Sequence, residues 1–393
     1  MTKPKLLRIT TVPLSLEKLL EGQLGFMQNY FEVTAISSDT DRLKKYGKQN
    51  DLNVFPVEMT RQITPISDTK ALLKLYKYLK KEKPTIVHTH TPKAGIVGML
   101  AAKLAKVPIR LHTVAGLPLM EATGKKRKLL DMVEKMTYSC ATKVYPNSKG
   151  LYDFIKKEKL TKPEKLKIIG KGSSNGIDTT HFNPQLYNQN TKKKLRNELS
   201  IHSDDFVFIF VGRLVGDKGI NELVQAFKNL KSKFKNLKLL LVGPFESALD
   251  PLKHPTLKEI EENSNIISVG FQQDVRPYFS ISNALAFPSY REGFPNVVMQ
   301  AGAMGLPSIV TDINGCNEII KDGENGLIIP PKEVVALQKA MERLIINNDL
   351  YNHLQQTSRE MIVNRYQREE VWQALLEEYQ ILLQEKGISS LEN

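Results

Sequence analysis

The sequence predicts an α/β protein with two doubly wound domains that face each other across a cleft. Short apolar runs alternate with amphipathic segments in the first half of the chain, which is typical of a parallel sheet covered by helices on both faces. A segment dense in turn-forming residues, 170–178, interrupts this alternation, which then restarts. At 393 residues the chain is long enough to form two such cores.

The first half contains apolar runs that we predict to be strands. They are Leu6–Val12, Glu32–Ser38, Asn53–Glu58, Thr85–Thr89, Ile109–Val114, Lys143–Asn147 and Leu166–Ile169. The segments between them have helical periodicity, most clearly in Asp68–Glu82, Lys93–Lys106 and Lys125–Cys140.

The second half repeats the pattern. Its predicted strands are Phe206–Gly212, Leu237–Gly243, Ile266–Phe271, Ala284–Pro288, Ser308–Thr311 and Leu327–Ile329. Helices are predicted between them, and two or three more follow in residues 332–385. Ligands of such sheets bind beyond the carboxyl ends of the strands, so the residues that directly follow strands are the candidates for a functional site.

Charge is unevenly distributed along the chain. Residues 1–190 contain 33 basic and 16 acidic side chains, a net charge of +17, whereas the remaining residues carry −3. This asymmetry favours a positive face that meets an anionic partner, which could be nucleic acid, an anionic membrane or a phosphorylated substrate. Solvated lysines without a partner are the alternative.

The two cysteines, Cys140 and Cys316, do not suggest a disulfide framework, and they favour a reducing compartment. The N-terminus lacks the apolar core of a signal peptide. No run of about 18 apolar residues predicts a membrane span. We therefore expect a cytoplasmic protein.

Two cations follow the strand predicted at Phe206–Gly212. Arg213 comes directly after this strand, and Lys218 lies five residues further on, beside Gly219, which opens a helix. Arginine offers a forked pair of donors to phosphate oxygens, and lysine offers a compact positive charge. Because a leaving diphosphate gains negative charge, these side chains could both bind it and stabilise its departure.

A carboxylate, Glu292, follows the strand predicted at Ala284–Pro288 in a turn rich in glycine and proline, and an apolar helix begins near Asn296. A carboxylate beside the free amides of a helix start is suited to hold hydroxyls and phosphates of one ligand. Gln300, further along this helix, could bond ribose hydroxyls, although a buried structural amide is the alternative. Together with Arg213 and Lys218, this turn predicts a site for a sugar joined to a diphosphate.

Three histidines occupy predicted strands of the first half. His88 and His90 lie two residues apart and therefore point to one face, and His112 lies near the end of another strand. Two histidines without a third ligand do not make a zinc site, so we predict no metal site. We expect His90, His112 and the nearby Lys93 to be candidates for the cleft, with a structural role as the alternative for His112.

Several stretches of the sequence, taken together, resemble retaining glycosyltransferases of family 4, which have the GT-B fold of two Rossmann-like domains. These stretches are FVGRLVGDKGINELVQAF, LLLVGP, EGFPNVVMQAGAMGLPSIVTD, IVHTHTPKAG and NGID. The resemblance implies an acceptor-binding domain over residues 1–185, completed by a C-terminal helix at about residues 367–393. It also implies a nucleotide-sugar-binding domain over residues 186–366.

The resemblance implies a role for each residue of a donor site. Arg213 and Lys218 would hold the donor diphosphate and Glu292 the transferred sugar, so these three are the expected catalytic residues. Further donor contacts are expected from Gly212, Gly243, Phe271, Gly293, Phe294, Pro295, Asn296, Val297 and Gln300. Gln300 stands where the family usually has a second glutamate. No cofactor is expected.

The resemblance also implies a retaining reaction that needs no metal ion. In this family retention is often explained by front-face attack, with a donor phosphate oxygen accepting the acceptor's proton, which suits a site without an obvious base. Arg213 and Lys218 would neutralise the leaving group. On the acceptor side, Gly116 follows Ala115, where the family commonly has a histidine, and His112 is the candidate substitute.

The HTHTPKAG run and the basic first half are most similar to bacterial enzymes that extend sugars on polyprenyl diphosphate for capsule or O-antigen. The expected partners are a nucleotide sugar, most simply a UDP-sugar, a polyprenyl-diphosphate-linked acceptor and an anionic membrane surface, and no nucleic acid. The best candidate for the membrane contact is the basic start of an amphipathic helix, Lys125 to Lys128. An ordinary solvated helix start is the alternative. The protein would then lie on the inner face of the cell membrane.

Two other function classes are open to the same sequence. A nucleotide-sugar epimerase on this fold would need acid–base side chains in the cleft, for which His88, His90, His112 and Glu121 are the candidates. A protein that binds nucleic acid through its basic half would have aromatic residues among its surface cations. The basic stretches are instead mostly helical lysines.

Overall fold

The computed structural model describes every residue except 1–2, 61, 63, 121, 247–249 and 389–393. The chain forms two compact units, Met1–Gly176 with Arg368–Asn393 and Ile177–Gln367, called the first and second unit below. The boundary precedes the one expected after residue 185, because Ile177 and Phe182 are buried in the hydrophobic core of the second unit.

The first unit is built on a six-stranded parallel sheet in the order β3-β2-β1-β4-β5-β6. Its strands are β1 (Lys5–Ile9), β2 (Glu32–Ser37), β3 (Asn53–Pro56), β4 (Ile86–His90), β5 (Ile109–Val114) and β6 (Lys143–Pro146). Alternate residues face opposite sides, so Leu7 and Ile9 pack into one core cluster and Leu6 into the other. Because β1 pairs with both β2 and β4, the order of strands reverses between β1 and β4.

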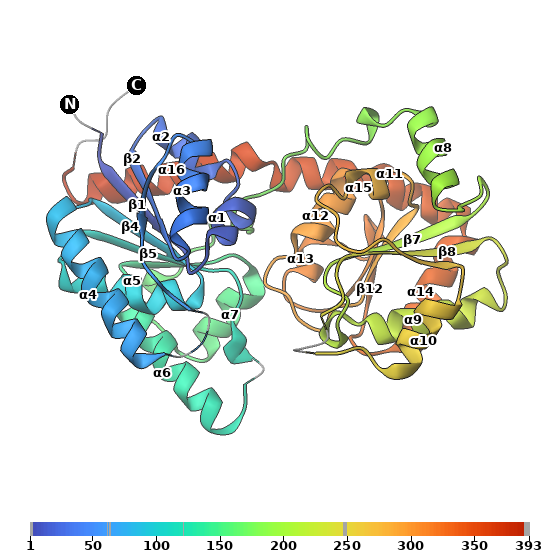
Figure 1. The fold of residues 1–393 in the computed structure, drawn as a ribbon, viewed down its shortest axis with the longest axis horizontal. Coiled ribbons are helices and arrows are strands. Elements are labelled where there is room, and N and C mark those ends of the chain that lie inside the picture. The colour runs from blue at the N-terminus through green and yellow to red at the C-terminus, as the bar shows by residue number, and fades with distance from the viewer. Residues whose placement is uncertain (1–2, 61, 63, 121, 247–249, 389–393) are drawn as a thin grey trace. The chain divides into compact units, whose positions relative to one another are not determined.

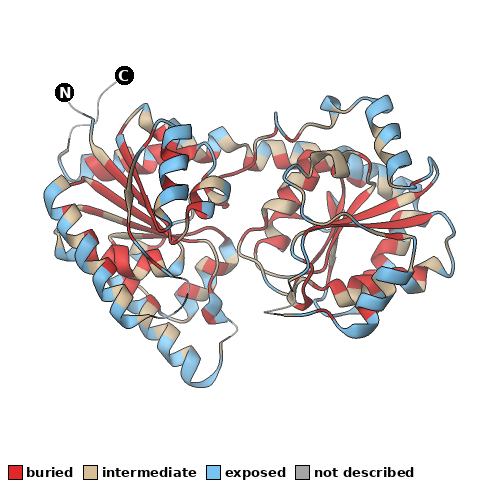
Figure 2. Ribbon diagram, in the orientation of Figure 1, coloured by how far each residue is buried: buried red, intermediate tan, exposed pale blue. Residues whose placement is uncertain are grey.

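Helices cover both faces of this sheet (Figure 1). One face is covered by α4 (Pro65–Glu82), α5 (Pro92–Leu104), α6 (Gly124–Cys140) and α7 (Lys149–Lys157). The other is covered by α1 (Pro13–Leu19), α2 (Gln23–Gln28), α3 (Thr40–Gln49) and the C-terminal α16 (Arg368–Glu385). Figure 2 shows buried strands and exposed outward faces on α4 and α6.

The second unit has a parallel sheet in the order β12-β11-β10-β7-β8-β9. Its strands are β7 (Phe206–Val211), β8 (Leu237–Val242), β9 (Ile266–Ser268), β10 (Ala284–Phe287), β11 (Ser308–Thr311) and β12 (Gly326–Ile329). Its helices are α8 (Gln189–Glu198), α9 (Ile220–Lys231), α10 (His254–Glu262), α11 (Arg276–Ser280), α12 (Asn296–Ala303), α13 (Cys316–Ile319), α14 (Val334–Ile346) and α15 (Asn348–Tyr366). α9, α10 and α14 lie on one face of the sheet, and α12 and α15 on the other (Figure 1).

One strand prediction is wrong. The apolar run Leu166–Ile169 makes only an isolated bridge, between Leu166 and Val144 of β6. One hydrogen bond of this bridge runs from Lys167 N to Val144 O. The next donor along β6 would be Pro146, which has no N–H, so the ladder cannot continue.

Within the described residues, no helix combines the length and apolarity needed to cross a bilayer.

Candidate active site

The loops that follow β7 and β10 carry the central pair of the site. These strands are parallel neighbours, so both loops lie at the same edge of the sheet. Lys218, in a short 3₁₀ helix after β7, forms an ion pair with Glu292, and the two side chains are only 16% and 15% exposed. Ser289 Oγ donates to Glu292 Oε1 at 2.8 Å, and the Lys218 ammonium lies 5.9 Å from the centre of the Phe287 ring. The structure thus brings two predicted catalytic residues together.

A second ion pair lies beside the first. Asp217 Oδ2 accepts from Arg291 Nη2 at 2.8 Å and from Arg291 Nε at 3.1 Å. The Asp217 amide donates to Asp250 Oδ2 at 2.5 Å, and its carbonyl accepts from the Tyr290 amide at 2.9 Å. These contacts fix the backbone on which Lys218 stands. The sequence pattern did not predict them, because the partners of Asp217 lie 33 and 74 residues away.

Arg213 follows β7 and forms an ion pair with Glu246, which lies in the loop after β8. This pair is more open to water, with side chains 46% and 34% exposed. Glu246 was not among the predicted site residues. Arg213 was predicted because residues that follow parallel strands lie where ligands bind, and Glu246 lies four residues after β8. The same reasoning could therefore have identified Glu246.

The turn between Glu292 and α12 is held from behind by Asn314. Asn314 Nδ2 donates to the carbonyl oxygens of Glu292 and Gly293, at 3.0 Å and 2.6 Å. Phe294 and Pro295 are buried, and Gly293, Asn296 and Val297 are half-buried. α12 begins at Asn296 without a side-chain cap, so amides of its first turn are available to an anion.

Other predicted donor contacts lie apart from this turn. Gln300 is half-buried on α12, four residues after the helix begins at Asn296. Phe271 lies in the loop after β9 and is 73% exposed. Gly212 and Gly243 lie at the ends of the neighbouring strands β7 and β8, with φ of 152° and 147°. Within the described residues, no group of three His, Cys, Asp or Glu side chains is arranged to hold a metal ion.

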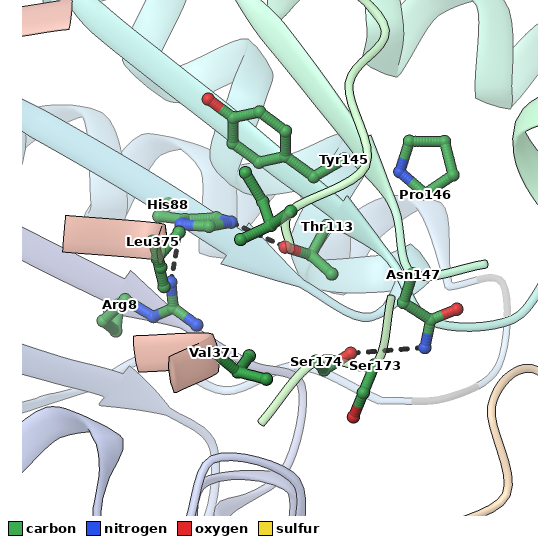
Figure 3. Close-up of a pocket in the computed structure, with 11 residues that line it drawn as sticks. Arg8, His88, Thr113, Tyr145, Pro146, Asn147, Ser173, Ser174, Val371 and Leu375 are labelled. Carbon is green, nitrogen blue, oxygen red and sulfur yellow. Dashed lines mark hydrogen bonds between the residues drawn. The ribbon is translucent and has the colours of Figure 1, made fainter. Parts of the chain in front are cut away.

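A small pocket in the first unit lies at the carboxyl ends of β4, β5 and β6, against α16 (Figure 3). Its volume is about 20 Å³, enough for one water-sized group. Arg8, only 2% exposed, donates from Nη1 to His88 Nδ1 at 2.5 Å and to the Tyr379 hydroxyl at 2.8 Å. Burial and the Arg8 charge lower the pKa of His88 well below its usual range, so His88 is neutral. Nothing in the apolar pattern of β1 indicated a buried arginine.

The predicted acceptor residues occupy separate environments. His90 is 1% exposed, neither ring nitrogen has a partner in the described part of the chain, and burial lowers its pKa to about 3. His112 Nδ1 lies 2.8 Å from Thr89 Oγ1, and burial lowers the pKa of His112 to about 4. Lys93 forms an ion pair with Asp68 at 2.5 Å.

Around Gly116, no heavy atom of the described residues, apart from its neighbours in the chain, lies within 4 Å of where a Cβ would stand. Glu121, an acid–base candidate for the epimerase alternative, lies outside the described residues. The other candidates for that role, His88, His90 and His112, are all buried. The described part of the first unit therefore gathers no exposed acid–base cluster from the predicted residues.

Sequence models of two families match the chain. The family described as Glycosyl transferases group 1 matches residues 191–361, and Glycosyl transferase 4-like matches residues 21–148. A capsular polysaccharide biosynthesis glycosyltransferase of Staphylococcus aureus, CapM, is 35% identical over 386 residues, 98% of this chain and 99% of its own length. The UDP-Gal:alpha-D-GlcNAc-diphosphoundecaprenol alpha-1,3-galactosyltransferase of Escherichia coli is 30% identical over 339 residues, 86% of this chain and 85% of its own.

Solved glycosyltransferase structures share the fold. A glycosyltransferase from Rickettsia africae ESF-5 has a TM-score of 0.79 at 19% identity, covering 98% of this chain and 99% of the other. Anabaena HepE in complex with UDP has a TM-score of 0.78 at 17% identity, covering 97% and 100%. With the two parallel sheets and the relatives above, these findings show that the chain is a glycosyltransferase of family 4 with the GT-B fold.

Proposed function

We propose that this glycosyltransferase moves a sugar, with retention of configuration, from a UDP-sugar to a saccharide on polyprenyl diphosphate during surface polysaccharide synthesis. The observation that carries the proposal is the meeting of Lys218 and Glu292 at one sheet edge, with Arg213 following the same strand as Lys218. The names of the S. aureus and E. coli relatives support the polysaccharide and the lipid-linked acceptor.

In this proposal the second unit holds the donor. Arg213 and Lys218 bind the diphosphate, and Glu292 accepts hydrogen bonds from sugar hydroxyls. The turn from Gly293 to Val297 presents backbone amides to the ligand, and Gln300 bonds the ribose. Gly212, Gly243 and Phe271 follow neighbouring strands and complete the donor contacts.

Retention follows from attack on the face from which the diphosphate leaves. The acceptor hydroxyl forms the new glycosidic bond while the bond between the sugar and the diphosphate breaks, and a phosphate oxygen takes the hydroxyl proton. Arg213 and Lys218 balance the charge that gathers on the diphosphate, so we propose that no divalent ion is needed.

The acceptor and the membrane belong to the first unit in this proposal, with His90, Lys93, His112 and Gly116 as its acceptor candidates. The outward face of α6 carries an exposed apolar stripe at helical spacing, Leu129, Met132 and Met136. Exposed lysines share this helix: Lys125, Lys126, Lys128 and Lys135. Apolar side chains among lysines suit the headgroup region of an anionic bilayer, where the enzyme would act on the cytoplasmic side.

The thermal midpoint with UDP, GDP and ADP tests the donor assignment. A ligand that binds only the folded chain raises stability by about 2.7 kcal/mol at a hundredfold excess over Kd. We expect UDP to raise the midpoint most and Arg213→Ala to reduce the rise. Transfer from UDP-sugars to a synthetic polyprenyl-diphosphate-linked N-acetylglucosamine, with the anomer assigned by NMR, tests the reaction.

Three results would contradict the proposal. A rise of the thermal midpoint with GDP or ADP alone would mean that the donor carries that nucleotide and not UDP. An inverted anomer would exclude front-face attack. Transfer to soluble saccharides with none to the lipid-linked substrate would remove the polyprenyl acceptor.

A further inference from the structure

Both proposed donor cations are already bound to carboxylates. Lys218 pairs with Glu292, and Arg213 pairs with Glu246. If the proposed function holds, a diphosphate that binds these cations must take the place of carboxylate oxygens. The cost is greater at Lys218, because the side chains of its pair are 16% and 15% exposed, against 46% and 34% for the Arg213 pair.

Glu292 is held near the position that the diphosphate would occupy. Ser289 Oγ donates to its carboxylate at 2.8 Å, and Asn314 donates to its carbonyl oxygen at 3.0 Å. Thr311 Oγ1 in turn donates to the carbonyl of Ser289, which ties this loop to β11. A carboxylate anchored in this way stays close to the phosphates and repels them unless another donor compensates for the loss of Lys218.

We propose that Glu292 makes the site prefer the intact nucleotide sugar over the bare nucleoside diphosphate that the reaction releases, while Glu246 competes with both ligands for Arg213. The hydroxyls of the donor sugar give Glu292 new hydrogen bonds in place of Lys218. The bare diphosphate takes Lys218 and offers Glu292 nothing, so a partly buried carboxylate is left without its cation. The same side chain that holds the sugar therefore also speeds release of the product nucleotide.

Titration calorimetry with UDP and with UDP-galactose, UDP-glucose and UDP-N-acetylglucosamine tests this inference. Glu292→Gln keeps the size of the side chain and removes its charge. We expect it to bind UDP about tenfold more tightly than the native enzyme and to lose most of the preference for the best UDP-sugar over UDP. Glu246→Gln should tighten UDP binding less, at most about fivefold, because its pair is more exposed.

A matched control and a double variant separate this effect from a general loss of negative charge. Glu259→Gln removes an acid of the same unit that pairs with Lys228, away from both donor cations, and should leave UDP affinity unchanged. In a Lys218→Ala background, Glu292→Gln should tighten UDP binding by less than it does in the native background, because the competition for Lys218 is absent and only the repulsion between the carboxylate and the phosphates remains. Melting curves confirm that each variant is folded.

Several outcomes would overturn the inference. UDP affinity that is unchanged or lower in Glu292→Gln would do so, as would an equal gain in the Lys218→Ala background. In either case, if the native enzyme binds UDP tightly and Lys218→Ala weakens that binding, the inference fails while the proposed donor site remains supported. If neither UDP, GDP nor ADP binds the native enzyme, the donor site and this inference both fall.

Discussion

Gly243 lies so close to Gly212 that a Cβ on Gly243 would stand 1.8 Å from the Gly212 carbonyl oxygen. The two glycines end the neighbouring strands β8 and β7. No side chain fits in this space, and the φ of Gly243, 147°, is itself unfavourable for other residues. The close approach of the two loops therefore requires glycine at position 243.

Gly243→Ala should consequently destabilise the second unit by about 2–4 kcal/mol, through steric overlap with backbone and an unfavourable φ. Urea unfolding followed by circular dichroism measures this change. Gly116→Ala is the matched control, because the residues that the structure describes leave open space around its Cβ position, and its stability should stay near that of the native chain. Equal stability of Gly243→Ala and the native chain would contradict the close approach.

Lys218→Ala and Glu292→Ala should each lower turnover by at least about a hundredfold, because each removes a proposed contact to the charge or sugar that moves in the reaction. Circular dichroism should show an intact fold. Lys228→Ala, which removes an exposed lysine paired with Glu259, should keep native turnover. Unchanged turnover in both site variants would remove these residues from the active site.

Gln300→Glu should keep activity, since a carboxylate oxygen accepts a hydrogen bond from a ribose hydroxyl as an amide oxygen does. Gln300→Leu should weaken UDP binding because leucine has no hydrogen-bond acceptor for the ribose hydroxyls. Steady-state kinetics with saturating acceptor would separate the two. Loss of activity in Gln300→Glu would mean that the amide group has a role that a charged side chain cannot fill.

His90→Leu should stabilise the first unit by about 1–3 kcal/mol at neutral pH, because it removes two buried nitrogens without partners in the described chain. Burial lowers the pKa of His90 from 6.5 to about 3. Between these values the unfolded chain binds a proton that the folded chain does not, so His90 costs stability as the pH falls below 6.5.

The variant should therefore lose less stability between pH 6.5 and pH 4 than the native chain does. His112, whose pKa burial lowers to about 4, leaves part of the acid sensitivity in place. Urea unfolding at several pH values measures how the free energy of unfolding changes with pH. His353→Leu, at an exposed histidine, is the control. A raised KM for the lipid-linked acceptor in His90→Leu would support the acceptor role, and an unchanged KM would count against it.

Met132→Glu should weaken binding to vesicles with anionic lipid by about tenfold, because it places a charge in the apolar stripe of α6. Met132 is 59% exposed, so the fold should tolerate the change. Ile346→Glu, at an exposed apolar residue of the second unit, should bind vesicles as the native chain does. Cosedimentation measures binding, and equal loss in both variants would contradict a docking face on α6.

Much of the fold was predictable because it depends on local patterns. Apolar runs between helical segments marked each strand of the two sheets, and turn-forming residues marked the change of unit. The run Leu166–Ile169 carried the same pattern and forms no strand, because the ladder depends on a donor that Pro146, in another segment, does not have.

The sequence by itself placed Arg213, Lys218 and Glu292 in loops that follow strands, and parallel strands bring such loops to one edge of the sheet. Only the tertiary structure decided that β7 lies beside β10, and hence that Lys218 meets Glu292, 74 residues away. It also decided that Glu246 holds Arg213, that Asp250 fixes the loop of Lys218, and that Arg8 is buried against His88. The periodicity of apolar residues along the sequence indicates which face of a single helix or strand is apolar. The contacts that a side chain makes with distant segments depend instead on the order of the strands and on how those segments pack.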